Sequence, residues 1–270
     1  MCKRLELPFS AFIELKNFAD EKGVKFLSTP DDVMSLNLLV DELQLPIIKV
    51  GSGEINNIPF LRKIGAKKRG VILSTGMSTL GEVEIAYYTL LNSGAASVSL
   101  LHCTTSYPAT YESVNLKAME VLKSVFKTKI GYSDHTEGIE VSLAAVAMGA
   151  QIIEKHFTLD KELPGPDHKA SLNPEELDEL VKRIRNVEKA ISGSGKKEIH
   201  ENEVEIKKIV SRGIYLRTDL KAGDIITEEH LIFKRPLVEI STKYFDMVLN
   251  KKLRNSVEVN SPLKWDDILL

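Results

Sequence analysis

The sequence has little cysteine and no apolar segment long enough to cross a membrane. Cys2 and Cys103 are the two cysteines among 270 residues, one near the start and one inside an apolar run. Cysteines so placed provide neither a disulfide framework nor the paired spacing of a zinc site. Apolar runs such as Gly70–Leu73 and Val98–Leu101 are far shorter than the roughly 20 residues that span a bilayer. We therefore interpret Cys103 as a small core residue.

The sequence also lacks an excess of charge of either sign. Lysine and arginine together number 36, and aspartate and glutamate 38, so no strong field attracts nucleic acid or an anionic membrane. No charged segment followed by an apolar stretch and a cleavage site begins the sequence. We expect a cytoplasmic protein whose partners are small molecules, with no nucleic acid and no membrane among them.

Short β-rich runs alternate with longer segments of helical periodicity. The runs start 22 to 31 residues apart, which is the length of a strand, a helix and two short loops. Several runs are apolar on both faces, as in a parallel sheet covered by helices. The pattern predicts an α/β fold whose strands lie at Val24–Thr29, Ile47–Ser52, Gly70–Gly76, Val98–Thr104, Lys129–His135 and Gln151–Thr158. A closed (β/α)₈ barrel needs eight strands, so the sheet is either open or two βα units short at the front.

A helix with clear start signals follows the last run. Asn173 can cap it, Pro174 suits its first turn, and apolar residues recur behind them at helical spacing. A Gly, Ser and Lys stretch then leads into a polar segment typical of a linker. We predict a large domain over residues 1–192, a linker over 193–205 and a small β-rich domain over 206–270.

Polar side chains stand at the carboxyl end of every predicted strand. In parallel α/β folds these ends meet at one edge of the sheet, where functional residues gather. One polar strand end is usually a cap or a turn, whereas six in succession favour a single site. The side chains at these ends are Ser28, Thr29, Lys49, Ser52, Glu54, Ser74, Thr75, Thr104, Thr105, Tyr107, Ser133, Asp134, His135, Glu154, Lys155 and His156.

Two of these strand ends carry histidines. His135 and His156 end neighbouring strands, so we expect their imidazoles at adjacent positions of the rim. Such a pair beside carboxylates can hold a divalent metal that keeps positions open for water and substrate oxygen. The competing interpretation is that each histidine is structural, as we expect for His102 and His168.

The other rim residues suit an anionic substrate and acid–base chemistry. Serines and glycines at strand ends also make tight turns, which is the competing explanation. Glu54 can act as a general base or hold a sugar hydroxyl, or be a solvated loop carboxylate. Asp167 lies in a turn-rich loop after the last run, where a turn-forming role competes. The residues that offer one cation and several hydroxyls to a phosphate and a carboxylate are Lys49, Ser52, Ser74 and Ser133.

Seven short motifs, in this order, make the sequence similar to a known family. They are FLSTP, KVGSGE, ILSTGM, LLHCTTSYP, GYSDHT, EKHFT and PGPDH. Each is weak alone, but the ordered set extends over essentially the whole chain and resembles the N-acetylneuraminate (sialic acid) synthase family. The resemblance implies a (β/α)₈ TIM-type barrel followed by a small antifreeze-like (SAF) domain, which agrees with the linker and the change of character behind it.

The resemblance also implies a reaction and its residues. The reaction condenses phosphoenolpyruvate with N-acetylmannosamine or a related N-acylated amino sugar, releasing phosphate and leaving a sialic or other nonulosonic acid. The family's divalent-metal ligands, usually for Mn²⁺ with Mg²⁺ or Co²⁺ as alternatives, are matched by His135 and His156. Its phosphoenolpyruvate contacts are matched by Thr29, Lys49, Ser52, Ser74 and Ser133. Its catalytic and sugar-site residues are matched by Glu54, Tyr107, Asp167 and Arg235.

The resemblance also implies a homodimer, and the sequence departs from the family pattern at its start. In the family, the arginine matched by Arg235 reaches the sugar in a partner's barrel, so a domain-swapped homodimer is implied. The family's first two strands have no counterpart before Leu5, and we expect an N-terminally truncated barrel of about six βα units. Two other functions stay open: a non-catalytic sugar-binding or assembly subunit, and another metal-dependent aldolase that uses pyruvate itself.

Overall fold

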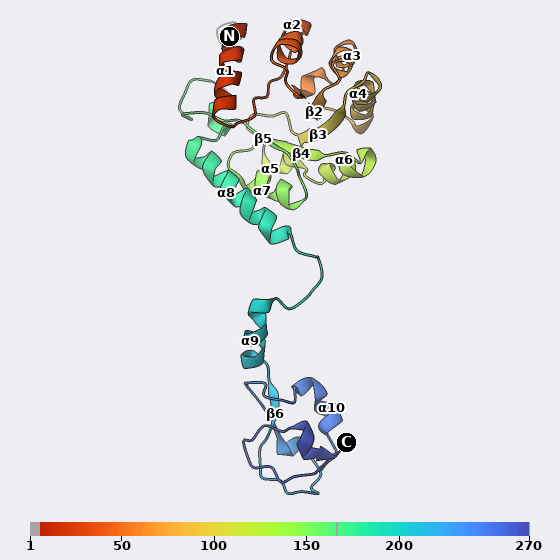
Figure 1. The fold of residues 1–270 in the computed structure, drawn as a ribbon, viewed down its shortest axis with the longest axis vertical. Coiled ribbons are helices and arrows are strands. Elements are labelled where there is room, and N and C mark those ends of the chain that lie inside the picture. The colour runs from red at the N-terminus through yellow and green to blue at the C-terminus, as the bar shows by residue number, and fades with distance from the viewer. Residues whose placement is uncertain (1–5, 166, 270) are drawn as a thin grey trace. The chain divides into compact units, whose positions relative to one another are not determined.

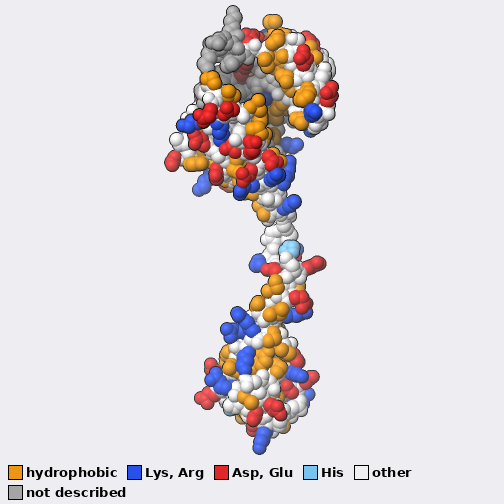
Figure 2. Space-filling model, turned by 90° about the vertical axis from the view of Figure 1, so that its left-hand side faces the viewer, with side chains coloured by type: hydrophobic (Ala, Val, Ile, Leu, Met, Phe, Trp, Pro, Cys, Tyr) orange, Lys and Arg blue, Asp and Glu red, His pale blue; other side chains and the backbone are white. Residues whose placement is uncertain are grey.

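The structure is a computed structural model that describes residues 6–165 and 167–269. Contacts within the chain divide it into two units, residues 1–193 and residues 194–270, and each is described by itself (Figure 1). In the described ranges, no helix is both long enough and apolar enough to cross a membrane. On the face shown in Figure 2, acidic and basic side chains are interspersed over both units, in keeping with the balanced composition.

The first unit is built on a parallel sheet of five strands, ordered β1-β2-β3-β4-β5. The α/β class with a curled, barrel-like parallel sheet is therefore confirmed. The strands are β1 (Ile47–Val50), β2 (Gly70–Ser74), β3 (Ser97–Cys103), β4 (Ile130–Asp134) and β5 (Ile153–Lys155). All four pairings are in parallel register, for example Ile48 with Val71 and Ser133 with Glu154.

The prediction of a first strand at Val24–Thr29 is wrong. This segment has no strand assignment, and it lies beside the outer edge of the sheet, where the backbone N–H of Lys49 donates to the Ser28 carbonyl over 3.3 Å. One backbone hydrogen bond to β1 does not make a ladder, so this β-rich segment is not a regular strand.

Helices cover the sheet and connect its strands. Helices α4, α6 and α7 pack on the strands, and Figure 1 shows them around the outside of the curled sheet. The predicted cap of α8 is confirmed: the Asn173 side chain accepts from the Glu176 backbone and Glu176 reciprocates. The helices of this unit are α1 (Phe9–Glu21), α2 (Val33–Asn37), α3 (Ile58–Ala66), α4 (Leu80–Asn92), α5 (Tyr111–Val114), α6 (Ala118–Phe126), α7 (Glu140–Ala147) and α8 (Pro174–Ile191).

One continuous core joins the sheet to these helices. It consists of apolar side chains from the strands and from the inner faces of the helices, among them Ile48, Leu73, Leu90, Leu100 and Tyr132, all with no exposed surface. Truncating such a side chain to alanine costs about 2 to 5 kcal/mol. The core therefore holds the strands firmly, and their carboxyl ends form a fixed rim.

The second unit is β-rich, as predicted, but the predicted linker is partly helical. Helix α9 (Glu201–Val210) occupies part of residues 193–205, because acidic residues in its first turn and lysines in its last complement the helix dipole. Antiparallel strands pair as β6 (Gly213–Leu216) with β7 (Leu231–Lys234), and β8 (Lys252–Leu253) with β9 (Ile268–Leu269). Residues such as Ile214, Leu216, Ile226 and Leu263 form a separate core.

Candidate active site

A cavity of about 190 Å³ lies at the carboxyl ends of the five strands. It brings together most of the residues that the sequence predicted for one site, even though they come from five different strands or the loops behind them. The predicted strand-end residues that line it are Lys49, Ser52, Ser74, Thr105, Tyr107, Ser133, His135, Glu154 and His156, and Cys103 is among the other lining residues.

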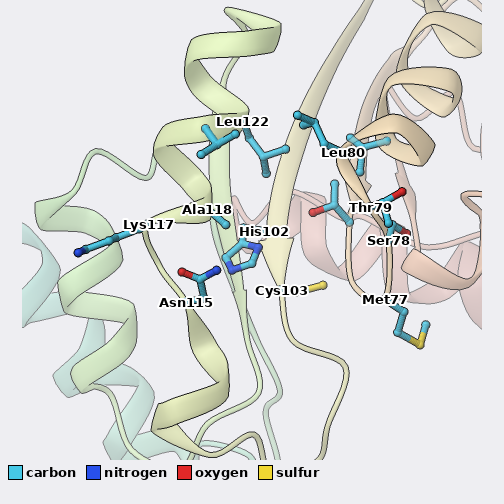
Figure 3. A pocket seen from close by; sticks show the side chains of 13 residues that line it. Met77, Ser78, Thr79, Leu80, His102, Cys103, Asn115, Lys117, Ala118 and Leu122 are labelled. Atoms are coloured by element: carbon cyan, nitrogen blue, oxygen red, sulfur yellow. The ribbon is translucent and has the colours of Figure 1, made fainter.

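Alternation along the strands decides which rim residues face the cavity. Successive side chains of a strand point to opposite faces, and Figure 3 shows His102 and Cys103 on opposite sides of β3. On β4 and β5 the same alternation turns Ser133 and Glu154 inward. The expectation that Asp134 and Lys155 also belong to the rim is wrong, because both point behind it and pair with each other in the interior.

Lys49 is the centre of a polar network inside the cavity. Its ammonium group donates to the Ser74 hydroxyl over 2.8 Å and lies 3.4 Å from a carboxylate oxygen of Glu154. The other carboxylate oxygen of Glu154 accepts from the Ser133 hydroxyl over 2.7 Å. Glu154 is thus a central residue to which sequence reasoning gave no role. Its position two residues before His156, on the same face of the chain, is the signal that could have identified it.

The loop after β2 brings a backbone donor close to Ser52. The N–H of Gly76 donates to the Ser52 hydroxyl over 2.9 Å, and the Cys103 sulfur lies 3.3 Å from the same oxygen. A Cβ at position 76 would lie 2.2 Å from the Thr105 hydroxyl oxygen. The close approach of the Ser52, Cys103 and Thr105 side chains explains why position 76 is a glycine. Cys103 is buried as predicted, but it also lines the cavity.

The two histidines meet as predicted, with ring centroids 5.4 Å apart. Nδ1 of His135 lies 2.8 Å from the Thr104 carbonyl oxygen. Because a carbonyl only accepts, Nδ1 carries the proton and Nε2 keeps its lone pair. Burial lowers the pKa of His135, and the backbone bond to Thr104 partly opposes that shift. A neutral imidazole with a free Nε2 is the form that binds a metal.

The chemistry of these donors fits a divalent metal that is held by few protein ligands. Within residues 6–165 and 167–269, no cluster of three or more His, Cys, Asp or Glu side chains is arranged as a complete metal site. Two imidazoles can hold a cation that keeps positions open for water and substrate oxygen, and Glu154 lines the same cavity.

Tyr107 and Asp167 lie on the histidine side of the cavity. The Tyr107 ring is 4.3 Å from the His135 ring and 5.5 Å from the His156 ring, centroid to centroid. A carboxylate oxygen of Asp167 lies 3.8 Å from Nδ1 of His156. Burial raises the pKa of Tyr107, and the nearby Cys103 and Asp167 act in the same direction, so its phenol stays protonated and can donate a hydrogen bond.

Four residues with predicted roles are not among those that line the cavity: Asp167, which adjoins His156, and the three that follow. Glu54 is half-buried in the short helix after β1, where it accepts from the Asn57 side-chain amide over 2.7 Å. Thr29 is exposed at the edge of the sheet. Arg235 is exposed behind β7 in the second unit. Their predicted roles stay predictions.

A second, larger cavity lies behind β3, between α4 and α6. It has a volume of about 630 Å³, and Figure 3 shows His102 and Asn115 on one wall with Ser78, Thr79 and Leu80 on the other. His102 faces this cavity, and one of its ring nitrogens lies 2.8 Å from the Val114 carbonyl oxygen. Burial lowers the pKa of His102. This environment fits the structural role predicted for this histidine.

Comparison with known proteins places the chain in a family. Residues 1–197 match the NeuB family model, and residues 211–269 match the SAF domain model. The chain belongs to the NeuB family. Among NeuB relatives, the N,N'-diacetyllegionaminic acid synthase of Campylobacter jejuni is 49% identical over 93% of this chain and 75% of its own length. The enzyme of that name from Legionella pneumophila is 43% identical over 99% of this chain and 76% of its own length.

A solved structure agrees with the NeuB assignment. The N-acetylneuraminic acid (sialic acid) synthetase from Leptospira borgpetersenii, in complex with citrate, superimposes with a TM-score of 0.70 at 40% sequence identity. The match covers 76% of this chain and 70% of that one. The resemblance that the seven motifs indicated is thereby confirmed at the level of the family.

Proposed function

We propose that this chain condenses phosphoenolpyruvate with an N-acylated amino sugar, in a metal-dependent reaction that gives a nonulosonic acid and phosphate. The observation that carries the proposal is the cavity where one lysine, three serine hydroxyls and two imidazoles meet. NeuB family relatives named as synthases of legionaminic and neuraminic acids support it.

The lysine and serines would bind phosphoenolpyruvate. The Lys49 ammonium offsets the charge of a phosphate or carboxylate. The Ser74 hydroxyl accepts from Lys49 and the Ser52 hydroxyl accepts from Gly76, so each can donate its own proton to a substrate oxygen. Ser133 donates to Glu154, and Thr29 is the remaining, peripheral contact of the proposal.

His135 and His156 would hold the metal, Mn²⁺ in the first instance and Mg²⁺ or Co²⁺ as alternatives. When bound, such an ion polarises the aldehyde oxygen of the open-chain sugar. The π electrons of phosphoenolpyruvate form the new bond from its methylene carbon to the aldehyde carbon, while the aldehyde C=O π bond breaks and its oxygen takes up a proton. Water then adds to the cationic carbon that bears the phosphate and loses a proton. The C–O bond to phosphate breaks as the new hydroxyl gives up its proton, which leaves the ketone and free phosphate. Glu54 is proposed to guide this water, and Tyr107 and Asp167 to hold the sugar.

The proposal includes a homodimer in which Arg235 of each subunit serves the sugar site of its partner. Equilibrium sedimentation tests the dimer. Mixing Arg235→Ala subunits with His135→Asn subunits tests the exchange, because mixed dimers should regain activity that neither variant has alone. Mixed dimers with no activity would contradict the exchange.

Phosphate release tests the reaction. Protein freed of metal with a chelator is supplied with Mn²⁺, phosphoenolpyruvate and a series of N-acylated amino sugars that starts with N-acetylmannosamine. We expect release only when both substrates and the metal are present. Product formed from pyruvate without phosphate release would indicate an aldolase instead. Calorimetric binding of sugar without turnover would favour a non-catalytic subunit.

A further inference from the structure

Strands β4 and β5 carry an ion pair directly behind the two histidines. Asp134 and Lys155 are neighbours in the parallel register and are the last residues of their strands. The ladder therefore stops before His135 and His156, whose rings project beyond the last paired residues. Contacts other than the ladder must fix the two imidazoles.

The ion pair is buried and its groups are hydrogen-bonded. The Lys155 ammonium lies 3.1 Å from an Asp134 carboxylate oxygen, and their side chains are 3% and 0% exposed. That oxygen also accepts from the Ser142 hydroxyl over 2.6 Å. The other oxygen accepts from the backbone N–H and the hydroxyl of Thr136, over 2.9 and 2.7 Å. A buried charge pair with such partners is rigid, and removing one member leaves an uncompensated charge.

These contacts lie on both sides of His135 and on one side of His156. The Asp134 carboxylate and the Lys155 ammonium, which donates to the Thr136 carbonyl over 2.7 Å, fix the backbone on either side of His135. Lys155 also directly precedes His156 in the chain. One ion pair thus constrains the positions from which both rings start.

We propose that the Asp134–Lys155 ion pair is the positioning element that sets the separation of His135 and His156 for divalent metal binding. Neither residue touches substrate, and each acts through the imidazoles. The inference rests on the proposed metal-dependent function, and it adds residues outside the cavity to the metal site. Contacts behind metal ligands typically change metal affinity by about 10- to 100-fold when they are removed.

Calorimetric titration of the full chain with Mn²⁺ tests this role. Chelator-treated wild type is compared with Lys155→Met, with Asp134→Asn, and with a double variant that carries both changes and leaves no unpaired buried charge. We expect the Kd for Mn²⁺ to rise about 10- to 100-fold in folded variants, while the KM for phosphoenolpyruvate at saturating Mn²⁺ changes less than about threefold. Lys182→Met is the matched control, because it removes an exposed lysine that pairs with Asp178 on α8.

The possible results distinguish a failure of the positioning role from a failure of the proposed condensation reaction. If a single variant fails to fold, the double variant decides. A folded double variant that binds Mn²⁺ as tightly as wild type overturns the positioning role, and so does wild-type protein that binds no Mn²⁺. Wild-type protein that binds Mn²⁺ but releases no phosphate overturns only the proposed reaction, and the ion pair is still judged by the Mn²⁺ affinity of the variants.

Discussion

Replacing Lys49 by methionine removes a cation from the cavity while keeping a side chain of similar length. The lost contact is a charge-assisted hydrogen bond to substrate, which contributes about 1.5 to 3 kcal/mol. At about 1.4 kcal/mol per tenfold, that corresponds to a roughly 10- to 150-fold weaker affinity for phosphoenolpyruvate. The upper end is expected, because Glu154, 3.4 Å away, would then face the substrate phosphate without the neighbouring ammonium.

Two independent measurements give the ratio of the variant's to the wild type's affinity for phosphoenolpyruvate. Steady-state phosphate release gives the KM for phosphoenolpyruvate, and calorimetry gives its Kd without turnover. The matched control is Lys67→Met, which breaks a surface pair with Asp41 over 2.6 Å. Such pairs contribute about 0 to 1 kcal/mol to stability, and this one should leave both constants unchanged. A folded Lys49→Met protein whose KM and Kd change less than about threefold would refute the assignment of Lys49 to the substrate anion.

Three further predictions concern stability. Gly76→Ala should lower the free energy of unfolding in urea by about 1 to 3 kcal/mol, because the new Cβ would lie 2.2 Å from the Thr105 hydroxyl oxygen. A Cβ at Gly81 meets no neighbouring group within 4 Å, so Gly81→Ala should not have this effect. Equal losses in the two variants would contradict the close packing at Gly76. Burial lowers the pKa of His102 below its usual 6.5. As pH drops through 6.5, the unfolded chain is protonated at His102 before the folded chain is, so the free energy of unfolding falls. The His102→Gln variant should lose less stability than wild type between pH 7.5 and pH 5.5. An identical loss in both proteins would exclude a contribution of His102 to the pH dependence of stability. Asn173→Ala removes the cap of α8 and should cost about 0.5 to 2 kcal/mol, and an unchanged thermal midpoint would show that the cap is unimportant.

Local sequence signals predicted the elements whose structure is decided locally. The cap at Asn173 and the apolar stripe behind it predicted α8, and strand spacing predicted the parallel sheet. The same signals failed for Val24–Thr29, because a β-rich composition does not reveal whether a segment forms a hydrogen-bonded ladder with a neighbouring strand. They also failed for α9 (Glu201–Val210), because a polar composition is shared by linkers and by exposed helices.

The candidate site was predicted as a set of strand ends but not as a network. Strand ends located Lys49, Ser133 and both histidines, since parallel strands bring their carboxyl ends together. Composition alone could not separate Glu154, which faces the cavity, from Lys155, which turns away into the buried pair. That distinction follows from the alternation of side chains along a strand, but only when the last residue of each strand is known.

Carbon-13 NMR of the reaction with [3-¹³C]phosphoenolpyruvate tests the proposed function most directly. The protein is incubated with this substrate, Mn²⁺ and an N-acylated amino sugar, and the fate of the labelled methylene carbon is followed. We expect the label in a new product, bonded to the former aldehyde carbon of the sugar, with one phosphate released per product. Label that stays in phosphoenolpyruvate, or moves to free pyruvate, with every sugar and metal tested would contradict the proposed condensation.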